Sequence, residues 1–277
     1  MPARPPKLGI LAGGGALPAR LVAACRESGR DVFVVAHEGI SDESAVENAE
    51  HEWVNLGAVQ RTIEALREKA VEEIVLAGPV RRPSLSSLRL DRRAIKALVG
   101  IGGGQLGDNR LLSRIVAEIE SEGFRVVGID DILTELVTPT GAIGAVAPDD
   151  GARADIATGC RVAKALGALD IGQAVVTQQG MVLGVEAVEG TDALLARCAG
   201  LRRDGPGGVL VKLKKPGQEG RADLPTIGPG TVERAREAGL VGIAIEAGGS
   251  LIIDRPAVAA AADAAGLFVV GIAPDEL

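Results

Sequence analysis

The stretch KLGILAGGGALP, residues 7–18, decides the first part of the fold. Residues 7–12 form a short apolar run that predicts a buried strand. Three glycines separate this run from residues 16–29, whose apolar positions predict a helix that ends at Gly29. The apolar residues 31–37 predict a second strand. A strand, a helix and a strand in this order form a βαβ unit, and such units build parallel sheets.

The same alternation continues to residue 131. Further strands are predicted at residues 51–56, 72–78 and 124–130, and helices at residues 59–71 and 109–123. We expect the strand order 3-2-1-4-5, with a reversal between the first and the fourth strand. Ligands of open α/β sheets bind at such a switch point, beyond the carboxyl ends of the strands. The loops at residues 13–18 and 78–83 would meet there.

The second half of the chain has a different pattern. Residues 138–152, TPTGAIGAVAPDDGA, lack periodicity and predict a linker. Residues 172–190 predict a hairpin that turns at Gln179 and Gly180, and residues 240–254 predict two strands across a Gly-Gly turn. The expected fold class is α/β, with a Rossmann-like parallel-sheet domain in residues 1–137, the linker, and a mixed α/β domain in residues 153–277.

Composition excludes several functions. The 277 residues include one Trp, three Phe and no Tyr, and the formal charge is −7, so neither aromatic stacking nor a basic surface for nucleic acid is expected. Cys25, Cys160 and Cys198 are widely spaced and predict reduced thiols in a cytoplasmic protein. His37 and His51 have no evident triad partners, which disfavours serine–histidine hydrolysis. No signal peptide or membrane-spanning segment is predicted.

The glycines at positions 13–15 have two interpretations. Backbone that approaches a ligand closely, at the start of a helix, suits a phosphate or sugar. A strand-to-helix turn with positive φ explains the same glycines without a ligand. A dinucleotide fingerprint is less well supported, because Pro18 replaces its last glycine and His37 with Glu38 is only an approximate ribose-binding acid.

Two further loops carry candidate residues. AGPVRRP, residues 77–83, places Arg81 after a strand end, where a guanidinium suits phosphate oxygens; a solvated surface arginine is the alternative. In GGGQLGDNRLLSR, residues 102–114, Asp108 is expected to cap a helix whose first turn holds Asn109. A capped helix explains most of this segment, and nucleotide contact is the alternative.

The most unusual loop is LKKPGQEGRADLPTIGPG, residues 213–230. Cations and carboxylates alternate in it, and the preceding strand ends at Lys212. Hard cations such as Mg²⁺ bind carboxylate oxygens together with substrate phosphates, so the loop suits a metal-assisted phosphate site. A solvated loop in which Asp223 serves as a turn or cap residue explains the same composition.

At these motifs the chain resembles the LpxI-type UDP-2,3-diacylglucosamine pyrophosphatases of bacterial lipid A biosynthesis. The resemblance extends along the chain through LGILAGGGALP, AGPVRRP, GDNRLL, DIGQAVV, VEGTDALL, RADLPTIG and AGLVGIAIEAG. It implies hydrolysis of UDP-2,3-diacylglucosamine to UMP and 2,3-diacylglucosamine 1-phosphate, with Mg²⁺ or another divalent cation such as Mn²⁺. It also implies that water attacks the phosphorus on the sugar side. The family often has Asn where Pro79 stands here.

The resemblance implies that Asp223 is the essential acidic, catalytic residue, and we expect it to bind the metal or to orient the attacking water. The residues expected to bind substrate are Gly13, Gly14, Gly15, Ala16, Leu17, Gly78, Arg81, Asp108, Asn109, Thr191, Asp192, Lys212, Lys214, Arg221 and Thr226. The expected location is cytoplasmic. Peripheral contact with lipid at the cytoplasmic face of the inner membrane and a homodimer are left open. The alternatives are a nucleotide-cofactor-dependent Rossmann oxidoreductase and a non-catalytic UDP-sugar-binding regulator.

Overall fold

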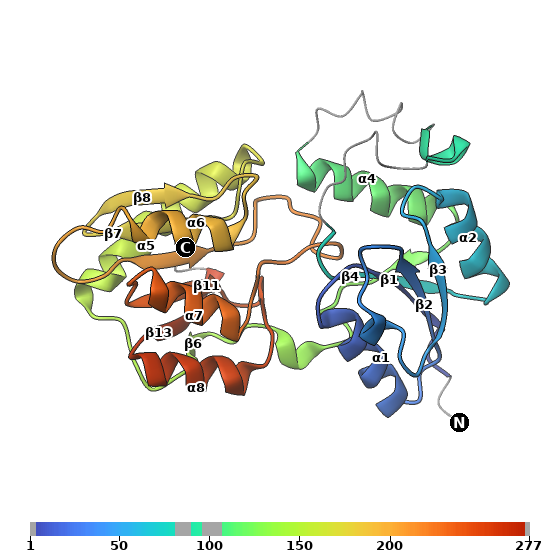
Figure 1. The fold of residues 1–277 in the computed structure, drawn as a ribbon, viewed down its shortest axis with the longest axis horizontal. Coiled ribbons are helices and arrows are strands. Elements are labelled where there is room, and N and C mark those ends of the chain that lie inside the picture. The colour runs from blue at the N-terminus through green and yellow to red at the C-terminus, as the bar shows by residue number, and fades with distance from the viewer. Residues whose placement is uncertain (1–3, 81–89, 96–106, 275–277) are drawn as a thin grey trace. The chain divides into compact units, whose positions relative to one another are not determined.

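The computed structural model describes residues 4–80, 90–95 and 107–274. The chain divides into two compact units (Figure 1). Unit 1 contains Met1–Thr134 together with the short segment Glu219–Asp223, and unit 2 contains Glu135–Gln218 and Leu224–Leu277. The first half of the chain therefore folds with five residues from the second half.

Unit 1 is built on a parallel sheet. Its elements are β1 (Leu8–Ala12), α1 (Leu17–Glu27), β2 (Val32–His37), β3 (Glu50–Val54), α2 (Val59–Glu68), β4 (Glu73–Ala77), α4 (Asp108–Ser121) and β5 (Arg125–Val126). The strands lie in the order β3-β2-β1-β4-β5, and every pair is parallel. The predicted order 3-2-1-4-5 is confirmed.

Helices cover both faces of this sheet, so its central strands are apolar along nearly their whole length. Ile63 of α2 and Val116 of α4 belong to the same buried cluster as Phe33 and Ile74 of the sheet. These two helices therefore share one face, and α1 lies on the other (Figure 1). This arrangement leaves the carboxyl ends of the strands to the loops that follow β1, β2 and β4.

Unit 2 is built on a mixed sheet. Its elements are β6 (Gly141–Ala142), α5 (Asp150–Ala168), β7 (Ala174–Gln178), β8 (Met181–Val185), α6 (Thr191–Ala199), β9 (Val209–Lys212), β10 (Thr226–Ile227), α7 (Pro229–Glu237), β11 (Gly242–Glu246), β12 (Leu251–Ile252), α8 (Arg255–Ala265) and β13 (Phe268–Ile272). The order is β6-β13-β11-β9-β7-β8, in which β9, β11 and β13 are parallel. The predicted α/β fold class, with a mixed second half, is confirmed.

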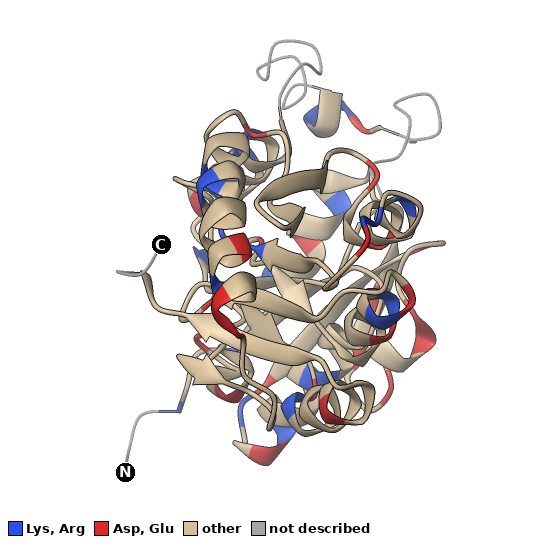
Figure 2. Cartoon of the chain, turned by 90° about the vertical axis from the view of Figure 1, so that its left-hand side faces the viewer, with Lys and Arg blue, Asp and Glu red and all other residues tan. Residues whose placement is uncertain are grey.

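Side chains alternate between the two faces of this sheet. Val209 and Val211 of β9 pack with α5, whereas Leu210 packs with α6, α7 and α8. This alternation places Leu213 on the α5 face and Lys212 on the opposite face. Charged residues of both signs lie on the helices and loops, while the strands are largely uncharged (Figure 2).

The hairpin predicted at Gln179 and Gly180 is confirmed. Strands β7 and β8 are antiparallel, and the two turn residues have φ values of 53° and 75°. The carboxylate of Asp155 on α5 accepts hydrogen bonds from both turn N–H groups, at 2.9 and 2.6 Å. The two strands predicted across the Gly-Gly turn are present as β11 and β12, but they form no hairpin, because β12 pairs with β10 and not with β11.

The residues predicted as a linker, 138–152, carry regular structure. Strand β6 pairs with β13, and Asp149 caps α5 by accepting a hydrogen bond of 2.7 Å from the N–H of Ala152. No helix among the described residues is long and apolar enough to cross a membrane. The three cysteines are buried thiols without a disulfide, as predicted, and burial raises the pKa of Cys160 to about 11.

Candidate functional site

The glycine loops that follow β1 and β4 pack directly against each other. The N–H of Gly13 donates to Ala77 O at 2.7 Å, and the N–H of Gly14 donates to Pro79 O at 3.0 Å. A Cβ atom on Gly13 would lie 2.4 Å from Gly78 O, and one on Gly78 would lie 2.2 Å from Gly14 O. Glycine is therefore required at both positions by backbone contact. The structure brings together the two loops that the sequence places at the switch point.

Asp42 occupies the third N–H of the first loop. Its carboxylate accepts a hydrogen bond of 2.7 Å from the N–H of Gly15, whose φ is 77°. The positive φ agrees with the turn interpretation of this loop. Helix α1 starts directly afterwards with Pro18 in its first turn, and Ala16 at its N-cap supplies no side-chain acceptor. An anion at this helix start would meet the N–H groups of Ala16 and Leu17, or would displace Asp42.

The loop after β2 is tied to the same place. Ser41 donates through Oγ to Ala12 O at 2.7 Å and accepts from the N–H of His37 at 2.7 Å. The His37 ring is buried, and this burial lowers its pKa, against a weaker opposing effect of the Val54 carbonyl. Sequence reasoning missed Ser41 and Asp42. The available signal for Asp42 was an acidic residue in the loop after the second strand, four positions beyond Glu38.

Helix α4 supplies the next part of unit 1. It begins at Asp108, and its N-cap is Gly107, so the predicted Asp108 cap is wrong; the Asp108 side chain lies outside the described part of the structure. Asn109 accepts a hydrogen bond of 2.8 Å through Oδ1 from the N–H of Glu219. Arg81 lies outside the described residues, so its predicted role stays a prediction.

Arg221 fixes the short segment Glu219–Asp223 in unit 1. Its Nε and Nη2 atoms donate to the two oxygens of Glu219 at 2.8 and 2.9 Å, and Nη1 donates to Glu120 of α4 at 2.6 Å. The hydrogen bond to Glu219, followed by that to Glu120, raises the pKa of Arg221. Ala222 packs against the buried cluster of unit 1. The predicted substrate contact of Arg221 would therefore have to compete with two carboxylates.

Asp223 ends this anchored segment. Its N–H donates to Glu219 O at 3.1 Å, and the residue is half-buried. Among the described residues, no group of three or more His, Cys, Asp or Glu side chains is arranged to hold a metal ion. Mg²⁺ is commonly held by one or two carboxylates together with substrate phosphates and water. A single carboxylate such as Asp223 fits that manner of binding.

Lys212 is the centre of a second cluster, in unit 2. It lies at the carboxyl end of β9 and is 7% exposed. Its Nζ atom donates to Thr191 Oγ1 at 3.0 Å and to Thr226 O at 3.1 Å. Thr191 is the first residue of α6, and Thr226 lies just before α7, so a cation sits beside the starts of two helices. The structure brings together three of the predicted binding residues.

Glu186 joins this cluster and was not predicted. The N-cap of α6 is Gly190, and the Thr191 hydroxyl donates to Glu186 Oε1 at 2.5 Å. Asp192 pairs with Arg234 of α7 at 3.3 Å and faces solvent. An acid buried among apolar neighbours in VLGVEAV was the available signal for Glu186.

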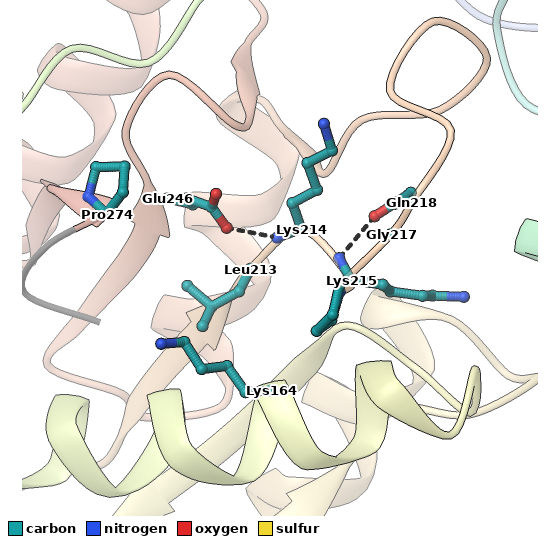
Figure 3. Close-up of a pocket in the computed structure, with 9 residues that line it drawn as sticks. Lys164, Leu213, Lys214, Lys215, Gly217, Gln218, Glu246 and Pro274 are labelled. Atoms are coloured by element: carbon teal, nitrogen blue, oxygen red, sulfur yellow. Dashed lines mark hydrogen bonds between the residues drawn. The ribbon is translucent and has the colours of Figure 1, made fainter.

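Lys214 lies beyond the end of β9, beside a hollow of about 570 Å³ (Figure 3). The hollow is lined by Lys164, Leu213, Lys214, Lys215, Pro216, Gly217, Gln218, Glu246 and Pro274. The N–H of Lys214 donates to Glu246 at 3.0 Å, and the Lys215 ammonium pairs with Asp170 at 2.8 Å. Lys214 contacts this hollow through its backbone and is not among the hydrogen-bond partners of Lys212.

A parallel sheet in unit 1 and a mixed sheet in unit 2, each packed with helices, define a two-unit α/β protein. Residues 7–136 match the family model of the LpxI N-terminal domain, and residues 139–270 match that of the LpxI C-terminal domain. The chain is 44% identical over 277 residues to the UDP-2,3-diacylglucosamine pyrophosphatase LpxI of Caulobacter vibrioides, across 98% of this chain and 99% of that protein. The chain belongs to the LpxI family and is an enzyme, a hydrolase of the pyrophosphatase type.

The solved structures that are similar to the chain have low sequence identity to it and low TM-scores. The biotin carboxylase subunit of a pyruvate carboxylase is 16% identical with a TM-score of 0.27, over 61% of this chain and 34% of that one. The C-terminal domain of the coenzyme A biosynthesis protein CoaBC is 13% identical with a TM-score of 0.28, over 44% of this chain and 75% of that one. Scores this low do not show a shared fold.

Proposed function

We propose that this protein hydrolyses UDP-2,3-diacylglucosamine to UMP and 2,3-diacylglucosamine 1-phosphate, a step of lipid A biosynthesis. The observation that carries the proposal is the 44% identity to the Caulobacter pyrophosphatase over nearly the full length of both chains. The family model of the C-terminal domain spans both Asp223 and Lys212. We place the reaction in the cytoplasm, with peripheral contact to the inner membrane where the acylated substrate resides.

Water is the nucleophile in this proposal. Its oxygen forms a bond to the phosphorus on the sugar side, the bond from that phosphorus to the bridging oxygen breaks, and the bridging oxygen leaves with UMP. Phosphoryl transfer needs mainly positioning and stabilisation of negative charge. Lys212 fits the second task, because it is a buried cation beside two helix starts.

Asp223 is the proposed metal-binding and water-orienting residue. Mg²⁺, or Mn²⁺ in its place, would supply charge neutralisation for the pyrophosphate when bound. Anchoring by Asn109, Glu120 and Arg221 fixes the backbone that leads into Asp223. A backbone held in this way loses little conformational freedom when Asp223 binds a ligand.

The test is release of UMP from UDP-2,3-diacylglucosamine by the purified protein, with and without Mg²⁺. Asp223→Asn keeps the size of the side chain and removes its charge, and we expect kcat to fall by about 100-fold or more. Glu237→Gln, an exposed acid at the end of α7, is the matched control and should stay within about twofold of the wild type. Wild-type turnover by Asp223→Asn would refute the catalytic role.

Two additional measurements separate the alternatives. In water labelled with heavy oxygen, attack on the sugar-side phosphorus puts the label in 2,3-diacylglucosamine 1-phosphate, and attack on the other phosphorus puts it in UMP. Binding of the UDP-sugar without turnover under any divalent cation would indicate a regulator instead of an enzyme.

A further inference from the structure

Glu186 is a buried carboxylate that contacts the Lys212 cluster through Thr191. Only 5% of the residue is exposed. One oxygen accepts the N–H of Gln173 at 3.1 Å, and the other accepts the hydroxyl of Thr191 at 2.5 Å. A carboxylate in such a position is costly unless donors satisfy both oxygens. The carboxylate of Glu186 therefore lies near Lys212, with the Thr191 hydroxyl hydrogen-bonded to both.

Thr191 links Glu186 to Lys212 through hydrogen bonds of its hydroxyl group. A hydroxyl has a single proton, and Thr191 gives it to Glu186. The lone pairs of Thr191 Oγ1 then face the Lys212 ammonium, which donates to them at 3.0 Å. With Thr226 O as its second acceptor, Lys212 Nζ uses two of its three N–H groups among the described residues. The third remains for a ligand anion.

Other charges of the surrounding elements are engaged elsewhere. Glu189 pairs with Arg197 of α6 at 2.7 Å, and Asp192 pairs with Arg234 of α7 at 3.3 Å. Glu246 of β11 lies on the α5 face of the sheet, where it accepts the N–H of Lys214. Glu186 is therefore the carboxylate that faces Lys212 from within this cluster.

We propose that Glu186 is a positioning residue that acts through Thr191 to aim the Lys212 ammonium at a phosphate oxygen of the substrate. This inference rests on the proposed function, in which Lys212 stabilises pyrophosphate charge. Glu186 itself touches neither the substrate nor the reacting atoms. Replacing Glu186 should lower kcat because the Lys212 ammonium is no longer held in position. In a variant that lacks Lys212, the same replacement should have little effect on kcat.

A double-mutant cycle tests the proposal on the full-length protein. With UDP-2,3-diacylglucosamine and Mg²⁺, we expect Glu186→Gln to lower kcat by about 10-fold and Lys212→Met by about 100-fold. In the Lys212→Met background, Glu186→Gln should lower kcat by less than about twofold, because the two residues act as a unit. The control Glu189→Gln, at an exposed carboxylate of the same turn, should leave kcat unchanged.

A second pair of variants guards against a general loss of folding. Thr191→Val removes the hydroxyl and should reproduce the effect of Glu186→Gln, whereas Thr191→Ser keeps the hydroxyl and should restore kcat. The inference is overturned if Glu186→Gln lowers kcat by the same factor in the wild-type protein and in Lys212→Met, or if Thr191→Val keeps the wild-type kcat. Either result leaves the proposed function intact. Absence of UMP release by the wild-type protein overturns the proposed function and the inference with it.

Discussion

His37 shows how one buried side chain makes folding depend on pH. It lies at the carboxyl end of β2 with 7% of its surface exposed, and Nδ1 is 3.4 Å from Val54 O. Burial lowers its pKa below the ordinary value of 6.5. The folded state therefore takes up a proton less readily than the unfolded state. Its stabilising contribution is fully present above pH 6.5 and is lost as the pH falls through the folded pKa.

We predict that His37→Asn weakens this dependence. The asparagine amide keeps a donor toward Val54 O but does not titrate. Between about pH 7 and pH 5, the free energy of unfolding of the wild type should fall more steeply than that of the variant. Urea unfolding at several pH values measures this difference. Equal slopes for His37→Asn and the wild type would contradict the prediction.

Individual residues also mark where the sequence stops being informative. Pro18 in the first turn of α1 could be predicted, because a missing N–H costs nothing there. The contact between Thr191 and Lys212 could not, because it joins residues 21 positions apart that share no local pattern. Asp42 likewise meets Gly15 from 27 positions away. Such pairs depend on which strands become neighbours, and local periodicity carries no information about side-chain contacts between them.

At the scale of elements, the loops after β1 and β4 form one closely packed pair. Gly78 has a φ of 92° and its Cβ position would lie 2.2 Å from Gly14 O. Gly123, after α4, has the same φ of 92° but nothing within 4 Å of its Cβ position. The two glycines therefore differ in packing and not in backbone conformation.

We predict different costs for alanine at these two positions. Gly123→Ala should lower the free energy of unfolding by about 1–2 kcal/mol, the cost of positive φ for a residue with a Cβ. Gly78→Ala should cost at least about 2 kcal/mol more, since the contacting atoms are backbone and the loops must move apart. Urea unfolding of both variants measures the difference. Equal losses would mean that the loop contact contributes nothing beyond the backbone conformation.

Elements with strong periodicity could be predicted from the sequence, and those without it could not. The strand order of unit 1 follows from the alternation of strands and helices. The turn at Gln179 and Gly180 follows from two apolar runs around it. Strands β10 and β12 contain two residues each, too few for a period, so β12 could be expected after the Gly-Gly turn but its pairing with β10 could not.

At the scale of the whole molecule, the segment Glu219–Asp223 belongs to unit 1 although units are otherwise nearly contiguous in sequence. No composition or motif in this segment indicates which half of the chain it joins. Ala222 packs against the buried cluster of unit 1, and Arg221 pairs with Glu120 of α4. The stability of unit 1 should therefore depend on a segment that begins 85 positions after Thr134, where its main part ends.

Trp53 allows this dependence to be measured, because it is the chain's single tryptophan and lies on β3 of unit 1. We predict that Ala222→Asp shifts the urea midpoint reported by Trp53 fluorescence to lower urea, by a loss of about 1–3 kcal/mol in the free energy of unfolding. The reason is that a charge enters a half-buried apolar contact without a new partner. Ala199→Asp adds the same charge at an exposed position of α6 in unit 2 and should change the Trp53 midpoint by less than about 0.5 kcal/mol. If the two variants shift the Trp53 transition equally, the segment contributes nothing specific to unit 1. If only Ala222→Asp shifts it, the backbone that leads into Asp223 is held by the folding of unit 1.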